Sequence, residues 1–274
     1  GLAVATVVAS TVLAAMVGVI GAAVVTMALV ALPSMLRRGY SPVLAVGTVM
    51  AGGTLGILIP PSVLAIVYGL VANQSVGELY LGSVFPGLVL SGLYILFSVG
   101  YALLNPKAAP RLSPEETPTW SERWRALRSI WSPLVLIFLV LGTIFLGLAA
   151  PTEAAAIGAF GAMVVAAIHR RLSWTILRLA LEQTAKATAV VLWIVFGANA
   201  FVGFYIAQGG DRYVSELLLG TGLSPWGILL LMQGILIVLG MFLDWVGILL
   251  LAVPVFVPII RDLGFDPLWF GVLY

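Results

Sequence analysis

Residues 52–62, Gly-Gly-Thr-Leu-Gly-Ile-Leu-Ile-Pro-Pro-Ser, place a glycine cluster and a proline pair inside a long apolar stretch. Proline cannot continue a preceding helix but can begin the next one, so the segment predicts a helix that breaks and restarts. Such a break frees carbonyl groups at the end of one half and N–H groups at the start of the other. Carbonyl oxygens suit a hard cation such as sodium, and helix N-termini suit an anion.

The two sides of this break are therefore candidates for two different ligands. The cation candidates are the carbonyls around Gly53, Thr54 and Gly56, together with the Thr54 hydroxyl. The anion candidates are Pro60, Pro61 and Ser62, because a helix that restarts near Ser62 directs its positive end at a substrate carboxylate. The alternative interpretation is a proline-kinked helix with a purely structural role.

Two other apolar stretches, residues 2–36 and 226–260, are also interrupted in their middle. At 1.5 Å per residue, each would run well past a hydrocarbon core of about 30 Å. Residues 2–36 form either a re-entrant hairpin or a single crossing, and both agree with the loop charges. The interruptions add three carbonyl candidates for the cation, which are Gly18, Gly21 and Gly240.

Two polar side chains near these interruptions could also bind a cation. Thr26 follows the first interruption, and its hydroxyl is either a ligand or a donor to its own helix backbone. Asp244 is the only acid deep in an apolar segment. Acids within the membrane are candidate functional residues, but a carboxylate at a hairpin tip can also simply contact water.

The composition indicates that lipid is the solvent. The chain is 62% hydrophobic and 9% charged, and its mean hydropathy is +1.16. Soluble domains carry about 25% charged residues. The absence of cysteine and the single histidine exclude a disulfide, a cysteine-ligated zinc or iron–sulfur site, and a histidine cluster. We predict an all-α polytopic membrane protein in a lipid bilayer, with no cofactor, no metal beyond sodium and no nucleic-acid partner.

The remaining segments follow from hydropathy and charge. Basic residues concentrate in Arg37-Arg38, in residues 105–131 and in His169-Arg170-Arg171, which places these loops in the cytoplasm. Residues 105–131 are predicted to form a linker that ends in an interfacial helix. Residues 172–186 are predicted to form a second interfacial helix. The predicted spans are a broken helix over 43–72 and helices over 79–104, 133–150, 152–168 and 188–207.

The two ends of the chain share a motif. Residues 32–42 align without gaps on residues 257–267 as Pro, five residues, Gly, an aromatic, any residue, Pro. Inverted repeats of this kind are typical of secondary transporters, which bind substrate where two broken helices meet. We predict a first repeat over 1–104 and a second over 132–274, whose own proline pair would lie beyond Tyr274. The alternative is a common helix–loop–helix connector.

Residues 52–62, with Tyr68-Gly69 after them, resemble the large membrane subunit, of DctM type, of tripartite ATP-independent periplasmic (TRAP) transporters. Further matching stretches occur in the family's order along the whole chain. They are Arg38-Gly39-Tyr40, Phe85-Pro86-Gly87, residues 151–158, residues 240–244 and residues 264–271.

The resemblance implies a sodium-coupled importer that moves its substrate, an organic acid such as a C4-dicarboxylate, by an elevator motion across the bacterial inner membrane. It implies a small membrane subunit and a periplasmic substrate-binding protein as partners. It also implies re-entrant hairpins over 1–38 and 226–260, and further sequence on both sides of this chain. The first hairpin tip departs from the family, because residues 17–23 lack the serines often found there and leave only backbone ligands.

Two other functions remain as alternatives. A stand-alone sodium/anion symporter of related elevator fold would need neither partner. An intramembrane enzyme would need a catalytic motif, and the sequence has no H-E-x-x-H, no G-x-S-x-G and no cysteine nucleophile. We therefore expect a transporter and not an enzyme.

Overall fold

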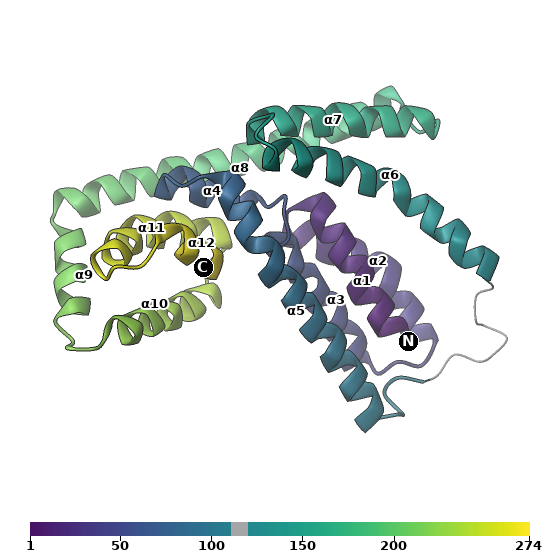
Figure 1. Cartoon of the computed structure of the whole chain (residues 1–274), viewed down its shortest axis with the longest axis horizontal. Coiled ribbons are helices and arrows are strands. Elements are labelled where there is room, and N and C mark those ends of the chain that lie inside the picture. The colour runs from purple at the N-terminus through teal and green to yellow at the C-terminus, as the bar shows by residue number, and fades with distance from the viewer. Residues whose placement is uncertain (111–119) are drawn as a thin grey trace. The chain divides into compact units, whose positions relative to one another are not determined.

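The computed structural model describes residues 1–110 and 120–274, and these residues form helices and no strand (Figure 1). The expected linker over 105–131 lies partly outside the described residues. The helices are α1 Leu2–Val17, α2 Ile20–Arg37, α3 Pro42–Leu58, α4 Val63–Ala72, α5 Val76–Leu104, α6 Trp120–Phe145, α7 Pro151–Ile168, α8 Trp174–Ala207, α9 Gly210–Leu219, α10 Pro225–Gly240, α11 Trp245–Asp262 and α12 Pro267–Leu273.

The chain divides into two compact units. The first contains Gly1–Val63 and Tyr80–Ile168, and the second contains Leu64–Leu79 and His169–Tyr274. In the first unit, α1 and α2 form a hairpin, and α3 packs against both of its arms (Figure 1). The close approach of α3 to the two arms of the hairpin depends on glycine residues of α3. A Cβ added at Gly53 would lie 2.2 Å from Val24 Cγ2, and one added at Gly52 would lie 2.5 Å from Ser10 Oγ.

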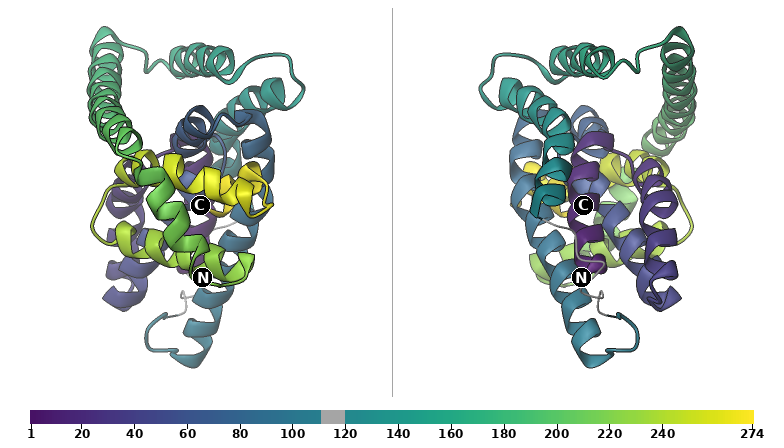
Figure 2. Two further views of the ribbon diagram at one scale, coloured as in Figure 1. Left: turned by 90° about the vertical axis from the view of Figure 1, so that its left-hand side faces the viewer. Right: turned by 90° about the vertical axis from the view of Figure 1, so that its right-hand side faces the viewer.

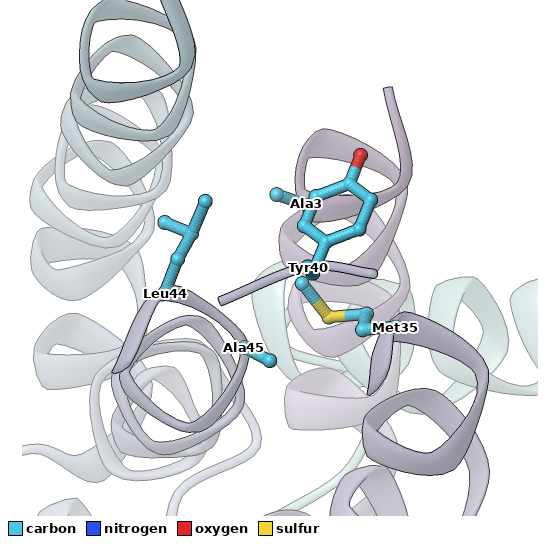
Figure 3. Close-up of a cluster of buried hydrophobic side chains, with 5 residues drawn as sticks. All are labelled: Ala3, Met35, Tyr40, Leu44 and Ala45. Atoms are coloured by element: carbon cyan, nitrogen blue, oxygen red, sulfur yellow. The ribbon is translucent and has the colours of Figure 1, made fainter. Parts of the chain in front are cut away.

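A buried cluster joins these three helices at the end where α3 begins. Ala3 from α1, Met35 from α2 and Leu44 from α3 surround Tyr40, which lies in the turn between α2 and α3 (Figure 3). The Tyr40 hydroxyl accepts a hydrogen bond of 3.0 Å from the backbone N–H of Leu2. This end of the hairpin is therefore held by both apolar packing and a backbone hydrogen bond.

The rest of the first unit consists of residues 80–104 of α5 and the α6–α7 pair. The hydroxyls of Thr11 on α1 and Ser91 on α5 lie 2.7 Å apart and form a hydrogen bond. Helices α6 and α7 pack against each other closely enough that a Cβ added at Gly161 would lie 2.4 Å from Leu136 Cδ1.

Two helices run through boundaries at which the sequence predicted separate elements. The expected interfacial helix at the end of residues 105–131 continues into the following span as α6, with Pro133 inside the helix. The expected interfacial helix over 172–186 and the span over 188–207 are likewise one unbroken helix, α8 (Figures 1 and 2). No glycine or proline occurs from residue 174 to 196 to end a helix there. Between the predicted span over 188–207 and the predicted hairpin over 226–260, the structure contains the short helix α9.

In the second unit, α11 packs against α8 and α10. The ring of Trp226, at the start of α10, lies 5.1 Å from that of Phe265 and 6.0 Å from that of Trp269, measured between centroids. The Tyr68 hydroxyl on α4 donates a 2.6 Å hydrogen bond to the Pro267 carbonyl at the start of α12. These contacts place the α11–α12 turn against both α10 and α4 within this unit.

The two copies of the sequence motif have the same local geometry. Gly39 and Gly264 both adopt a left-handed backbone, with φ of 75° and 81°. One residue later, the backbone N–H of Tyr40 donates to the Met35 carbonyl at 3.1 Å, and that of Phe265 donates to the Ile260 carbonyl at 3.0 Å. Ser41 and Asp266 then cap the next helix, which starts with proline in each case. The repeated pattern therefore encodes a repeated helix–turn–helix.

Among the described residues, six segments are long and apolar enough to cross a membrane. They are Ile20–Arg37, Pro42–Ala72, Val76–Leu104, Pro151–Ile168, Trp174–Ala207 and Trp245–Asp262. Their outward faces carry large apolar side chains such as Leu29, Phe85 and Trp193. Such surfaces suit a lipid environment, because an aqueous one would leave this apolar area solvated.

Candidate functional site

The predicted helix break lies between α3 and α4. Helix α3 ends at Leu58, Ile59 is extended, and the peptide bond between Pro60 and Pro61 is cis. Ser62 follows, and Val63 begins α4. Pro60 and Ser62 are buried, and both belong to the first unit.

The tip of the first hairpin sits directly on this break. Gly18 ends α1 in a left-handed conformation with φ of 65°. A Cβ added there would lie 2.7 Å from the Pro61 carbonyl oxygen. The Val63 N–H donates a 3.3 Å hydrogen bond to the Gly18 carbonyl. Glycine is required at this point for two reasons, the positive φ and the close backbone approach.

This hydrogen bond joins a predicted cation ligand to the start of the predicted anion-binding helix. The Gly18 carbonyl satisfies one of the N–H groups that a helix N-terminus leaves without an intrahelical partner. A carbonyl oxygen has two lone pairs, so the same atom could still accept a cation. The structure thus brings Gly18, Pro61 and Val63 together, from segments more than 40 residues apart in the chain.

The glycines of the cluster lie within α3, before the break. Gly53 packs against Val24, and Gly56 faces the Val19 carbonyl, with 3.5 Å between that oxygen and a Cβ added at Gly56. The carbonyls of Gly53 and Thr54 belong to helical residues, whereas Gly56 lies in the last turn. The arrangement explains these glycines by helix packing, and their role as cation ligands stays a prediction.

Side-chain hydroxyls around the break bond to neighbouring groups. The Thr54 hydroxyl donates to the Ala51 carbonyl at 2.7 Å and lies 3.2 Å from the Tyr94 hydroxyl. The Ser62 hydroxyl donates back to the Ile57 carbonyl, in the last turn of α3. The Tyr80 hydroxyl donates to the Ser62 carbonyl at 3.2 Å. Two tyrosines of α5 therefore hold the break from one side.

Gly21 and Thr26 lie away from the break. Both are exposed on α2, and a Cβ added at Gly21 would meet no atom within 4 Å. The Thr26 hydroxyl donates to the Ala22 carbonyl of its own helix at 2.7 Å, which is one of its two expected arrangements. Within the first unit, Gly18, Gly56, Pro60, Pro61 and Ser62 cluster around the break, and Gly21 and Thr26 do not.

The second hairpin, α10–α11, has a different tip. Helix α10 ends at Gly240, and Asp244 caps α11, its carboxylate accepting a 3.1 Å hydrogen bond from the Val246 N–H. Gly240 and Asp244 are both exposed. The Asp244 carboxylate thus has a local structural role, and its role as a cation ligand stays a prediction. Within the described residues, no three His, Cys, Asp or Glu side chains cluster as a metal site.

Three residues that support the break carry no recognisable signal in the sequence. Tyr80 and Tyr94 bond to it from α5, and Ser10 is buried against Gly52. A tyrosine or serine in an apolar helix gives no periodic signal of this role, because its partner lies on another helix. Pairing Tyr80 with Ser62 required knowledge of how α5 packs.

Comparisons with known proteins give consistent results. A family model described as "Tripartite ATP-independent periplasmic transporter, DctM component" matches residues 1–274. The C4-dicarboxylate TRAP transporter large permease protein DctM of Pseudomonas aeruginosa is 34% identical over the whole chain. The ectoine TRAP transporter large permease protein TeaC of Halomonas elongata is 30% identical over the whole chain. The sialic acid TRAP transporter large permease protein SiaM of Vibrio cholerae is 31% identical over 88% of the chain.

The chain spans part of the length of these relatives. It covers 63% of the Pseudomonas and Halomonas proteins and 55% of the Vibrio protein. The similarity extends over all the elements described above, including both hairpins and the helix break.

Proposed function

The chain belongs to the DctM component family of tripartite ATP-independent periplasmic transporters, and from that premise we propose that it forms the large permease subunit of a sodium-coupled importer of organic acids. Family membership and the apolar helices make it a multi-pass membrane protein. It is a transport protein and not an enzyme, because the relatives are transporter permeases.

The observation that carries the proposal is the contact between the first hairpin tip and the helix break. The Gly18 carbonyl and the Val63 N–H satisfy each other across this contact. Separation of the tip from the break would free both groups at once. A carbonyl suits sodium and the N-terminus of a helix suits a carboxylate, so one movement would open both sites. Such a contact offers a physical basis for coupling the two ligands.

We assign the ligands as follows. Sodium is held near the first tip and the end of α3 by the carbonyls of Gly18, Gly53 and Gly56 and by the hydroxyl of Thr54, whereas Gly21 and Thr26 lie away from the break and are left out of this assignment. The substrate carboxylate is held beside the segment Pro60, Pro61 and Ser62 at the start of α4, where the backbone N–H donors begin at Ser62 because proline has none. Helix α3 ends only at Leu58, so Gly56 and Gly18 are the members of this set that lie nearest the break.

The substrate class rests on the relatives. Their names give C4-dicarboxylates, ectoine and sialic acid as substrates. In residues 1–63 and 80–104, the charged side chains are Arg37 and Arg38 alone, and both lie at the C-terminal end of α2, away from the helix break. Within these two segments, backbone N–H groups and no cationic side chain are available at the break to a carboxylate.

We further propose that the subunit acts in the bacterial inner membrane with a small membrane subunit and a periplasmic substrate-binding protein. One relative, the isethionate TRAP transporter permease protein DctMQ of Oleidesulfovibrio alaskensis, is 28% identical over the whole chain, and the chain covers 42% of it. Its double name and greater length suit a fusion of a large and a small permease subunit.

The test is uptake of labelled organic acids into proteoliposomes. They would contain the full-length permease and its small subunit, with and without sodium and the periplasmic binding protein. Labelled succinate, ectoine and sialic acid would be compared. Uptake that needs both sodium and the binding protein would support the proposal. Uptake without the binding protein would overturn the tripartite assignment and favour a stand-alone sodium/anion symporter.

A further inference from the structure

An apolar groove runs along the first unit between α3 and α5. It has a volume of 550 Å³ and is lined mainly by side chains of these two helices, among them Val43, Ala51, Leu90, Leu93 and Phe97. Val43, Leu93 and Phe97 are 78%, 53% and 66% exposed, so the groove opens on the surface of the unit. In a membrane protein that surface suits hydrocarbon.

Most of the lining disfavours a polar occupant. Among the described residues that line the groove, none is charged. Two of the hydroxyls in this lining are paired, because Thr48 donates to the Leu44 carbonyl and Tyr94 bonds to Thr54. The hydroxyls of Ser98 and Tyr101 lie at one end of the groove. Away from that end, an organic acid would lose its hydration without gaining a partner, whereas an acyl chain would lose nothing.

The length of the groove matches one leaflet of the bilayer. On α5 it extends from Leu90 to Tyr101. At 1.5 Å per residue, this interval corresponds to about 16 Å. Half of a hydrocarbon core of 30 Å is about 15 Å. One acyl chain of one leaflet would therefore fill the groove from end to end.

The positive charges of this region lie at one end of the groove. In residues 1–63 and 80–110, the charged side chains are Arg37, Arg38 and Lys107. The segments that carry them are joined by a 2.9 Å hydrogen bond from the Ser41 N–H to the Ala108 carbonyl. Val43 and Tyr101, which line that end of the groove, lie close in sequence to Arg38 and Lys107.

A second cavity of 360 Å³ lies at the same end. It is lined by Tyr40, Pro106 and Ala109, and it shares Ser98 with the groove. The Arg37 guanidinium bonds back to the Pro33 carbonyl of its own helix, whereas no ion pair involves Arg38 or Lys107 in the part of the chain that the structure describes. A headgroup with a net negative charge would complement these cations.

We propose that the groove between α3 and α5 binds one acyl chain of an anionic phospholipid, with its phosphate beside Arg38 and Lys107. The loops that carry these cations are predicted to be cytoplasmic, and the cytoplasmic leaflet is rich in anionic lipid. The lipid lies beside the face of α3 that carries Thr48 and Ala51 and contacts the ring of Tyr94. It therefore packs next to the tyrosine that bonds to Thr54.

Native mass spectrometry of the full-length permease with its small subunit tests the proposal. The complex would be delipidated in detergent and titrated with palmitoyl-oleoyl phosphatidylglycerol or with the phosphatidylcholine of the same chains. We expect one retained phosphatidylglycerol, favoured about tenfold over phosphatidylcholine. A complex that retains neither lipid would overturn the proposal, because another segment or subunit would then occupy the groove.

Gly47 provides a sharp variant, because it lines the groove and an added Cβ would meet no atom within 4 Å. Gly47→Leu should fill the space and reduce phosphatidylglycerol retention at least about tenfold. Gly92→Leu is the matched control, since Gly92 is an exposed helical glycine with equally open space outside the groove. Equal retention by Gly47→Leu and the wild type would contradict the proposal.

Removing the positive charges distinguishes the contribution of the lipid headgroup from that of the acyl chain. Arg38→Gln with Lys107→Gln should abolish the preference for phosphatidylglycerol and leave phosphatidylcholine retention unchanged. Arg170→Gln with Arg171→Gln removes two cations elsewhere and should preserve the preference. A preference that survives loss of Arg38 and Lys107 would overturn the headgroup assignment.

Discussion

The two helical hairpins are followed by similar sequences but have different tips. Each is followed by the same left-handed glycine turn and a capped, proline-started helix. The tip of α1–α2 is a buried glycine whose backbone contacts Pro61 and Val63. The tip of α10–α11 is exposed and is capped by the Asp244 carboxylate.

The same turn motif therefore follows two hairpins whose tips are built differently. At Gly18 the tip has no side chain, so its carbonyl can reach the start of another helix. At Asp244 the side chain satisfies the N-terminus of its own helix, so this tip needs no partner for that purpose. The first tip therefore depends on tertiary contact, and the second is complete locally. Substitutions at the two tips should differ accordingly.

The largest effect is expected for Gly18→Val. The variant meets the Pro61 carbonyl at 2.7 Å and must hold a left-handed backbone, which costs about 1–2 kcal/mol by itself. Sodium-dependent uptake in proteoliposomes should fall at least about tenfold. Gly147→Val is the control, since Gly147 has a φ of 69° and open space around it. Equal loss in both variants would mean that backbone strain alone, and not the tip contact, explains the defect.

A second large effect is expected where α3 meets the returning arm of the first hairpin. Gly53→Ala would place a Cβ 2.2 Å from Val24 Cγ2 and should destabilise the protein by about 1–3 kcal/mol. Thermal unfolding in detergent would measure it. Adding Val24→Ala removes the clashing methyl and should recover part of the loss, whereas Gly92→Ala should cause none. No recovery in the double variant would contradict the packing role of Gly53.

An intermediate effect is expected for the Thr54–Tyr94 pair. Thr54→Val removes a proposed sodium ligand, so the sodium concentration that gives half-maximal uptake should rise at least about threefold. Tyr94→Phe removes only the supporting hydroxyl, 3.2 Å from Thr54, and should shift the sodium dependence less. The measurement is uptake against sodium concentration at fixed substrate. A larger shift for Tyr94→Phe than for Thr54→Val would argue against Thr54 as the ligand.

The smallest effect is expected at the second tip. Asp244→Ala removes the cap of α11 and should cost about 1 kcal/mol in thermal unfolding, whereas Asp244→Asn retains an acceptor and should be neutral. Equal destabilisation by both variants would contradict the capping role. The sodium dependence of Asp244→Asn sharpens the comparison, because a raised requirement would assign the carboxylate to the cation as well.

Much of the architecture was predictable because local physical chemistry decides it. The interruptions at Gly18 and at Pro60-Pro61 follow from residues that disfavour a continuing helix. The repeat turns follow from glycines in a conformation that other residues rarely adopt. The family assignment followed from motifs along the chain, and the family model confirms it. The inverted arrangement and the elevator motion stay predictions.

Other features were decided by contacts between helices distant in sequence. The sequence alone indicated that the apolar stretches are interrupted near Gly18 and at Pro60-Pro61, because glycine and proline act on their own backbone. It did not determine that the break begins after Leu58, that Gly53 packs against Val24, or that the Gly18 carbonyl meets the Val63 N–H. Those outcomes required α1, α2 and α3 to pack together, since each depends on an atom that another helix brings within a few ångströms.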